Sequence, residues 1–209
     1  MRIAILLALG LLLVGCGSND NESSGGGNTS MDCEIGGDES KAQLADLEEG
    51  KTHSVVVATT KGSFTFEMAT DISPCTTAAF AGLVDKGFFD GLTFHRIVPG
   101  FVIQGGDPLG NGMGGPGYTT VDAPPQDTTY DKGLVAMAKA GNEPAGTSGS
   151  QFFVVSADGV QLDPDYAVLG RVTDGLDVVE KIGELGNPSD PSGRPTEDVD
   201  IEKMELKAS

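Results

Sequence analysis

The sequence predicts a mainly β domain with two α-helices, in which short strands form a sandwich or a closed barrel. Three observations support this fold class. The 209 residues include 31 glycines and 11 prolines, a composition typical of many turns and short strands. Strand-length apolar runs recur between these glycines and prolines. Two segments carry the start and stop signals of a helix.

The first elements after residue 50 form a predicted β-hairpin. Residues 52–60 and 63–68 are rich in β-branched and aromatic side chains, and a Lys-Gly pair separates the two runs. In the second run, Phe64 and Phe66 alternate with polar residues, so one face of this strand should be buried.

Two helices are predicted in different parts of the chain. The first begins after Ser73 and the following proline, has an amphipathic apolar pattern and ends before Gly87. The second covers residues 175–185, with Asp177 near its start and Gly186 at its end.

The remaining elements are short strands. Each is an apolar run bounded by glycine or proline, at residues 92–97, 101–104, 134–138, 152–156 and 167–172. A last run at residues 199–206 would let the C-terminal segment pair back onto the sheet. Closure into a barrel would remove exposed sheet edges.

The first sixteen residues predict export and a lipid anchor. Arg2 precedes an apolar run at residues 3–14, so residues 1–15 resemble a signal peptide, and the run is shorter than the about 20 residues of a membrane span. The letters LVGC, which end at Cys16, resemble the bacterial lipobox and predict lipidation of Cys16. The alternative is an ordinary signal peptide followed by an incidental cysteine.

The N-terminal organisation follows from these signals. Residues 16–31 are polar and rich in Gly and Ser, which predicts a flexible tether. Residues 32–50 form an extension tied to the domain, and residues 51–209 form the domain itself. The formal charge of −18 argues against nucleic acid as a partner and against attraction to anionic lipid, so lipid alone would hold the protein at a bacterial membrane, outside the cytoplasm.

Two further cysteines, Cys33 and Cys75, are predicted to form a disulfide, because a lone pair in an exported protein is usually bonded. This bond would close a loop of roughly 40 residues and contribute about 4 kcal/mol to stability. The alternative is a metal site. With two histidines in the chain and no C-x-x-C motif, we expect no metal and no cofactor.

Two motifs carry the functional signal. Residues 94–107 read FHRIVPGFVIQGGD and residues 148–154 read SGSQFFV. They resemble the cyclophilin signatures F-H-R-x-x-P-G-F-x-x-Q-G-G-D and G-S-Q-F-F, and the letters GLVAMA at residues 133–138 also agree. The likeness covers about residues 55–206. It implies a closed, eight-stranded antiparallel barrel capped by two helices, with peptidyl-prolyl cis/trans isomerase activity.

The resemblance also implies the site residues. It assigns catalysis to Arg96, Phe101 and Gln104, and substrate binding to Val102, Ala138, Lys139, Phe153, Leu162 and Tyr166. Four of these positions or their neighbours differ from animal relatives: Val102 replaces Met, Lys139 replaces Asn, Gln161 replaces Trp and Tyr166 replaces His. The L-x-P-x-Y pattern at residues 162–166 and the cysteine pair look like the actinobacterial branch. Loss of the Trp equivalent implies weak cyclosporin binding.

These residue types suit rotation about an X-Pro bond. The cis and trans isomers differ by about 0.5–1 kcal/mol, but the barrier is near 20 kcal/mol because rotation breaks amide resonance. A donor directed at the proline nitrogen stabilises the twisted state selectively. Arg96 can supply that donor, and Gln104 can fix it or bind the substrate carbonyl; a surface ion pair is the alternative role for Arg96. Phe101, Phe153 and their apolar neighbours would hold the proline ring.

Other residues in these segments are given structural roles. Phe94 and Phe152 lie on the opposite pleat and should pack in the core. A hydrogen-bonded structural role is expected for His95 rather than general-base catalysis. The glycine-rich residues 110–117 lack the ending of a phosphate-binding loop and predict a mobile loop beside the groove.

Two functions are consistent with the sequence. The first is a monomeric isomerase that acts on proline-containing polypeptides as exported or cell-surface proteins fold. The second is a scaffold or holdase that binds proline-containing segments without turnover. The differences at Lys139, Gln161 and Tyr166 motivate the second.

Overall fold

The computed structural model describes residues 32–209. The predicted signal peptide, the lipidation site Cys16 and the tether at residues 16–31 lie outside the described residues. The strands are β1 (Ile35–Gly37), β2 (His53–Thr59), β3 (Gly62–Met68), β4 (Arg96–Val98), β5 (Val102–Gly105), β6 (Tyr118–Val121), β7 (Leu134–Met137), β8 (Thr147–Ser148), β9 (Phe152–Val155), β10 (Val168–Asp174) and β11 (Ile201–Ala208). The helices are the 3-10 turn η1 (Glu39–Lys41) and the α-helices α1 (Pro74–Asp85) and α2 (Leu176–Gly183).

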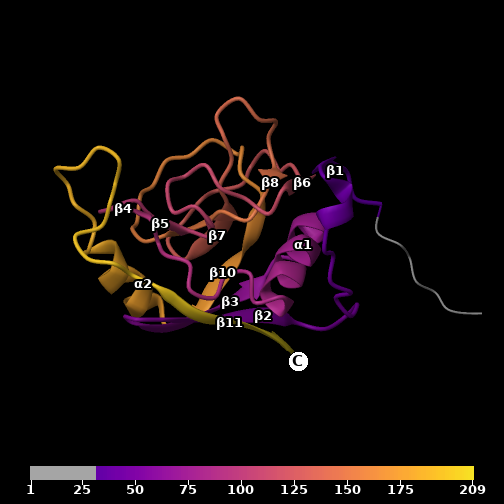
Figure 1. The fold of residues 1–209 in the computed structure, drawn as a ribbon, viewed down its shortest axis with the longest axis horizontal. Helices are drawn as coiled ribbons and strands as arrows, with labels where there is room; N and C mark the ends of the chain where they lie inside the picture. The colour runs from indigo at the N-terminus through magenta and orange to yellow at the C-terminus, as the bar shows by residue number, and fades with distance from the viewer. Residues whose placement is uncertain (1–31) are drawn as a thin grey trace, which may run out of the picture. The chain divides into compact units, whose positions relative to one another are not determined.

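Eight strands form one curled antiparallel sheet in the order β11-β2-β3-β10-β7-β9-β5-β4. The predicted hairpin is confirmed as β2 and β3, with Val57 opposite Phe64. The C-terminal strand β11 pairs back onto β2, as predicted. Figure 1 shows α1 and α2 at opposite ends of the sheet; α1 packs near β11 and β6, and α2 near β3, β4 and β5. The predicted strand number, direction and helix number are therefore confirmed.

The sheet curls into a half-barrel, and a short bridge joins its two ends. Its outer strands, β4 and β11, form no ladder with each other. The segments that precede them meet instead, because the Phe94 N–H donates to the Val199 carbonyl (2.9 Å) and the Ile201 N–H donates to the Leu92 carbonyl (2.7 Å). These bonds satisfy backbone groups that an open edge would expose.

The expected strand at residues 92–97 is wrong in its bounds. Strand β4 begins at Arg96 and ends at Val98, and Thr93 forms only an isolated bridge to Asp200. Leu92 and Phe94 alternate with polar residues, and Phe94 is fully buried in the core. Such a pattern cannot be distinguished from a strand by periodicity alone.

The helix α1 differs from the predicted amphipathic helix. Every residue from Cys75 to Val84 is buried. The core of the sheet covers one side, and the N-terminal extension covers the other: the Ala45 N–H donates to the Ala78 carbonyl (2.9 Å), and the backbone of Gln43 lies against Gly82. A helix covered on both sides is apolar all round.

The extension joins the domain in two ways. Strand β1 pairs with β6, which pairs with β8, and the three form a second small sheet. The predicted disulfide between Cys33 and Cys75 is present, with its Cα atoms 5.6 Å apart, and it attaches the extension to the first turn of α1. The part of the chain that the structure describes contains no helix long and apolar enough to cross a membrane.

Apolar side chains form two clusters on opposite faces of the sheet. The larger contains Phe94 and Phe152, which confirms their predicted packing role. The smaller contains Val102 and Phe153, which alternate with core residues along β5 and β9. An apolar cluster on the face away from the main core is where an apolar ligand can bind.

Candidate active site

The smaller cluster forms the floor of a pocket of about 230 Å³, which we call the slot. Its lining consists of Arg96, Phe101, Val102, Gln104, Ala138, Lys139, Phe153, Leu162 and Tyr166. All nine side chains predicted to be catalytic or substrate-binding therefore meet in one place. They come from strands β4, β5 and β9, from the turn between β4 and β5, from the residues after β7 and from the loop before β10.

The turn between β4 and β5 places Arg96 beside Gln104. The Phe101 N–H donates to the Val98 carbonyl (3.1 Å), with Pro99 and Gly100 between them. Gly100 has a φ of +72°, which a type II turn requires at its third residue and which glycine adopts without strain. This turn sets the register that pairs Arg96 with Gln104 across the hairpin.

Arg96 is held by a neutral partner. Its Nη1 donates to Oε1 of Gln104 at 3.2 Å. None of the carboxylates in residues 32–209 lies within ion-pair distance of this guanidinium. The remaining N–H groups of Arg96 therefore keep their positive charge at the edge of the slot.

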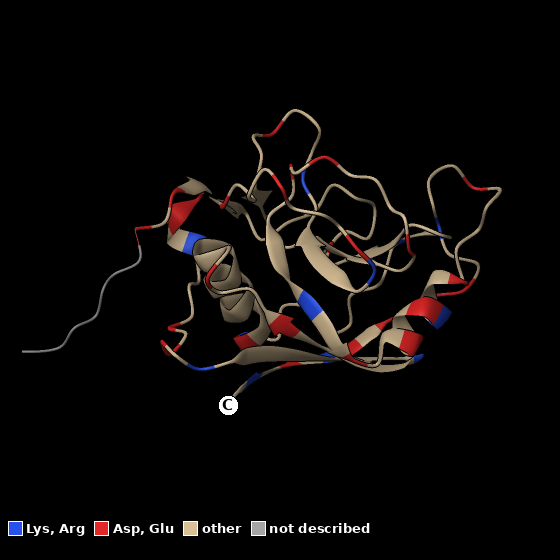
Figure 2. Cartoon of the chain, turned by 180° about the vertical axis from the view of Figure 1, so that it is seen from behind, with Lys and Arg blue, Asp and Glu red and all other residues tan. Residues whose placement is uncertain are grey.

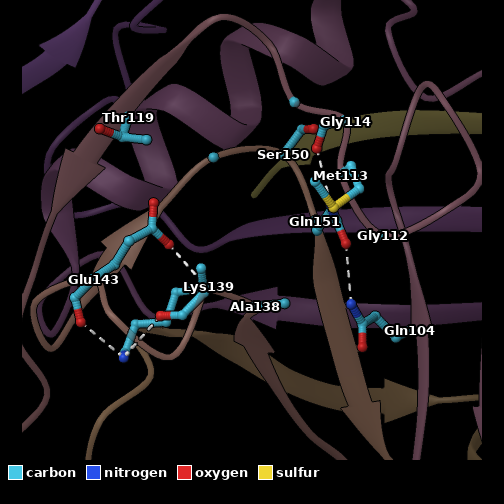
Figure 3. Close-up of a pocket in the computed structure, with 13 residues that line it drawn as sticks. Gln104, Gly112, Met113, Gly114, Thr119, Ala138, Lys139, Glu143, Ser150 and Gln151 are labelled. Carbon is cyan, nitrogen blue, oxygen red and sulfur yellow. Dashed lines mark hydrogen bonds between the residues drawn. The ribbon is translucent and has the colours of Figure 1, made fainter. Parts of the chain in front are cut away.

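A chain of side-chain amides fixes the orientation of Gln104. Its Nε2 donates to Oε1 of Gln151 (3.0 Å), and Nε2 of Gln151 donates to the Gly114 carbonyl (2.9 Å), as Figure 3 shows. The Gln104 amide must then present its oxygen to Arg96. Sequence reasoning missed Gln151 as a site residue, although it stands inside the G-S-Q-F-F block.

The aromatic wall of the slot is fixed from behind. The rings of Phe153 and Tyr166 meet edge to face, with centroids 5.4 Å apart. Behind them, the Tyr130 hydroxyl donates to the Tyr166 carbonyl (2.7 Å) and accepts from the Tyr166 N–H (3.0 Å). Burial raises the pKa of Tyr130, so this hydroxyl stays neutral and can both donate and accept. No sequence signal pointed to Tyr130, because its role depends on a segment 36 residues away.

A second pocket, of about 370 Å³, adjoins the slot and shares Gln104, Ala138 and Lys139 with it. The predicted glycine-rich loop forms one of its sides (Figure 3). The loop is anchored at its start by buried Asp107, which accepts from the backbone N–H groups of Leu109 (2.8 Å), Asn111 (2.8 Å) and Gly112 (2.5 Å).

Gln161, which stands where animal relatives have Trp, does not line the slot. It borders a separate hollow of about 300 Å³, which shares Leu162 and Tyr166 with the slot. Its side chain is exposed and donates to the neighbouring Val160 carbonyl (3.3 Å).

His95 has the expected structural position, but the expected hydrogen bonds of its ring are not formed within residues 32–209. Both ring nitrogens are buried, and neither has a hydrogen-bond partner within the described part of the chain. Burial lowers the pKa of His95, and the positive charge of Arg96 adds to this shift. The negative charge of Asp107 and the nearby Thr93 backbone oppose it without outweighing burial. A neutral imidazole without partners is a packing residue, not a base.

The surface of the protein carries mainly negative charge, as the composition of the chain predicts. Acidic residues outnumber basic ones, 31 to 13, and Figure 2 shows them spread over α2 and the surface loops. In residues 32–209, no group of three or more His, Cys, Asp or Glu side chains is placed to hold a metal ion. The slot itself offers the hydrogen-bond donors of Arg96 and an apolar floor.

Comparisons with known proteins identify the family of this chain. The family model for cyclophilin type peptidyl-prolyl cis-trans isomerases matches residues 54–206. Peptidyl-prolyl cis-trans isomerase B of Bacillus subtilis is 44% identical over 118 residues, which cover 56% of this chain and 80% of that protein. A peptidyl-prolyl cis-trans isomerase of Helicobacter pylori is 36% identical over 143 residues, which cover 67% and 86%.

A solved structure has the same fold. The cyclophilin type peptidyl-prolyl cis-trans isomerase of Cryptosporidium parvum, crystallised in the presence of the dipeptide Ala-Pro, matches with a TM-score of 0.65 and 30% identity. The match covers 75% of this chain and 99% of that chain. The slot and the hydrogen-bonded amides of Gln104 and Gln151 lie within the residues that the family model matches. This chain belongs to the cyclophilin-type peptidyl-prolyl cis-trans isomerases.

Proposed function

We propose that this isomerase rotates X-Pro bonds in exported or cell-surface proteins as they fold, and that Arg96 supplies the catalytic hydrogen bond. The observation that carries the proposal is the guanidinium of Arg96, which Gln104 holds at the edge of an apolar slot without a carboxylate partner. The Ala-Pro dipeptide used with the Cryptosporidium relative supports proline-containing peptides as substrates.

The mechanism follows from what changes as the bond twists. The proline ring would lie against Phe101, Val102 and Phe153, which hold one end of the bond while the carbonyl end rotates. As resonance is lost, the proline nitrogen regains its lone pair, and an N–H of Arg96 donates to it. Neither planar isomer offers that lone pair, so the hydrogen bond is strongest in the transition state and accelerates rotation in both directions.

The neutral amide partner matters for this chemistry. A carboxylate in place of Gln104 would attract the guanidinium and neutralise its charge. Gln104 orients Arg96 without removing its charge, and Gln151 keeps Gln104 from turning its NH2 group toward Arg96. The donor is therefore in place before the bond twists, which reduces the reorganisation cost of reaction.

The slot can be tested with paired peptides. Exchange spectroscopy by NMR on the purified full chain measures cis/trans interconversion of a short peptide with a central Ala-Pro bond. A control peptide with alanine in place of proline should bind much more weakly, because it lacks the ring that fills the slot. Binding of both peptides with equal affinity, or binding of the proline peptide without faster exchange, would contradict an isomerase and favour the scaffold role.

The location outside the cytoplasm rests on Cys16 and on the disulfide. The LVGC letters that end at Cys16 supply a lipidation signal, and a Cys33–Cys75 bond persists in an oxidising compartment. In bacterial cells, Cys16→Ser should move the protein from the membrane fraction to the soluble fraction. Equal membrane retention of the variant would refute the anchor without touching the enzymatic proposal.

A further inference from the structure

Lys139 is a buried lysine that lies between the slot and the adjoining pocket. It lies two residues after the end of β7 and lines both the slot and the adjoining pocket of about 370 Å³. Only 3% of its side chain is exposed. An ammonium group buried to this extent is costly unless the protein pairs it and satisfies its donors.

The protein itself satisfies the three N–H donors of Lys139. Its Nζ lies 2.6 Å from Oδ2 of Asp165 and donates to the backbone carbonyls of Glu143 (3.0 Å) and Ala140 (3.5 Å). Figure 3 shows this nitrogen directed at the Glu143 backbone and away from Gln104. An ammonium has three donors, so none is left for a substrate. Lys139 is therefore a poor candidate for direct contact with the reacting bond.

These contacts join two loops that border the slot. Lys139 and Glu143 belong to the segment between β7 and β8, whereas Asp165 directly precedes Tyr166 in the segment before β10. The Nζ of Lys139 also lies 5.7 Å from the centroid of the Tyr166 ring, within the range of a cation–π contact. Tyr130 fixes the backbone of Tyr166 on one side, and Lys139 contacts its ring on another.

We propose that Lys139 is a positioning residue which, through Asp165 and Tyr166, fixes the aromatic wall of the slot and sets the affinity for proline-containing peptides. The inference rests on the proposed function of the slot. It changes the role of Lys139 from a substrate ligand to a clamp between two loops. Substrate contact would fall to Tyr166 and Phe153, whose rings meet edge to face at 5.4 Å.

The test separates affinity from catalysis. Peptide affinity (Kd) is measured by NMR titration of the full chain with the Ala-Pro peptide, and the exchange rate of the bound peptide is measured separately. K139M should raise Kd by roughly tenfold, because the ring it positions would lose its fixed geometry, and should change the bound exchange rate by less than about twofold. D165N should also raise Kd, because it removes the carboxylate that pairs with Lys139. The double variant should bind no more weakly than K139M, since both changes break one clamp.

A matched control is available at Lys132. This lysine also pairs with two carboxylates, those of Glu180 and Asp158, but it lines none of the pockets around the slot. K132M should leave Kd unchanged, whereas a general effect of losing a lysine ion pair would raise it. If K139M fails to fold, K139Q replaces it in the test. K139Q keeps a donor for the Glu143 carbonyl but loses the charge that pairs with Asp165.

Three results would overturn the clamp. They are a Kd within twofold of wild type in the folded Lys139 variant, additive effects in the double variant, or a bound exchange rate reduced as much as in Arg96→Ala. Absence of exchange in the wild-type protein would instead count against the proposed function, because affinity is measured independently of exchange.

Discussion

At the scale of single residues, the choice of Gln at position 104 determines what Arg96 can do. The amide orients the guanidinium through one hydrogen bond of 3.2 Å and leaves its charge available. Gln151 and the Gly114 carbonyl then fix that amide from behind. The proposed catalytic donor thus depends on a line of neutral groups, each of which fixes the orientation of the next.

His95 gives a prediction for pH dependence. Burial lowers its pKa in the folded protein below the usual value of about 6.5. At this residue the unfolded chain therefore binds a proton more readily. The stability that neutral His95 contributes is fully present above about pH 7 and is lost as the pH drops below about 6.5. Urea unfolding at pH 7.5, 6.5 and 5.5 should show this decline in wild type and a smaller one in His95→Gln. Parallel declines in the two proteins would show that the protonation of His95 does not differ between the folded and unfolded states.

The three residues predicted to be catalytic have a role that is local in sequence, whereas Phe153, Leu162 and Tyr166 were placed in the site only by the family resemblance. Arg96, Phe101 and Gln104 lie within one hairpin, and the order of letters there already encodes their geometry. Tyr130 and Asp165 escaped prediction because they act across 36 and 26 residues of sequence, through contacts that only the folded chain creates. The missing partner of His95 is likewise a property of packing that no single-residue preference encodes.

At the scale of elements, two short loops give the groove its shape. The turn with Gly100 sets the register of β4 and β5, and the loop after Asp107 forms a side of the adjoining pocket. The strands of the main sheet were predictable from apolar runs, apart from the start of β4. The short strands β1, β6 and β8 of the small sheet were not predicted. Apolar character reports burial, and residues 92–95 are buried or half-buried without pairing as a strand.

Asp107 provides the prediction at this scale. Burial raises the pKa of its carboxyl, but the three backbone N–H bonds outweigh that effect, and the net shift is downward, so the carboxylate is charged at neutral pH. Asp107→Ala leaves those N–H groups without an acceptor and should lower the free energy of unfolding by about 3 kcal/mol. Hydrogen exchange should accelerate most in residues 108–114. Unchanged protection of that segment would show that the carboxylate does not hold the loop.

At the scale of the whole molecule, the N-terminal extension is part of the folded unit. The family match begins at residue 54, but β1 and the disulfide attach residues 33–37 to β6 and α1. The bond between the cysteines was predictable from their number and from the predicted export of the protein. The burial of α1 on both sides was not, because the sequence of a helix does not show what covers its second face.

The disulfide should stabilise the molecule without taking part in catalysis. Cys33 and Cys75 are 42 residues apart, and on the chain-entropy model their bond contributes about 4 kcal/mol. The double change Cys33→Ser and Cys75→Ser should lower the free energy of unfolding by about that amount, measured in urea, while peptide exchange by the folded protein stays within about twofold of wild type. An unchanged unfolding midpoint, or a folded variant without activity, would contradict this division of roles.

The central claim is tested most directly by comparing Arg96→Ala and Arg96→Lys with wild type in the peptide exchange measurement. Arg96→Ala should slow exchange of the bound peptide by about 100-fold or more while the peptide still binds, because the lost donor acts mainly on the twisted state. Arg96→Lys keeps the charge but loses the planar set of donors, and it should fall between the two. Wild-type exchange in Arg96→Ala would contradict the role assigned to this guanidinium.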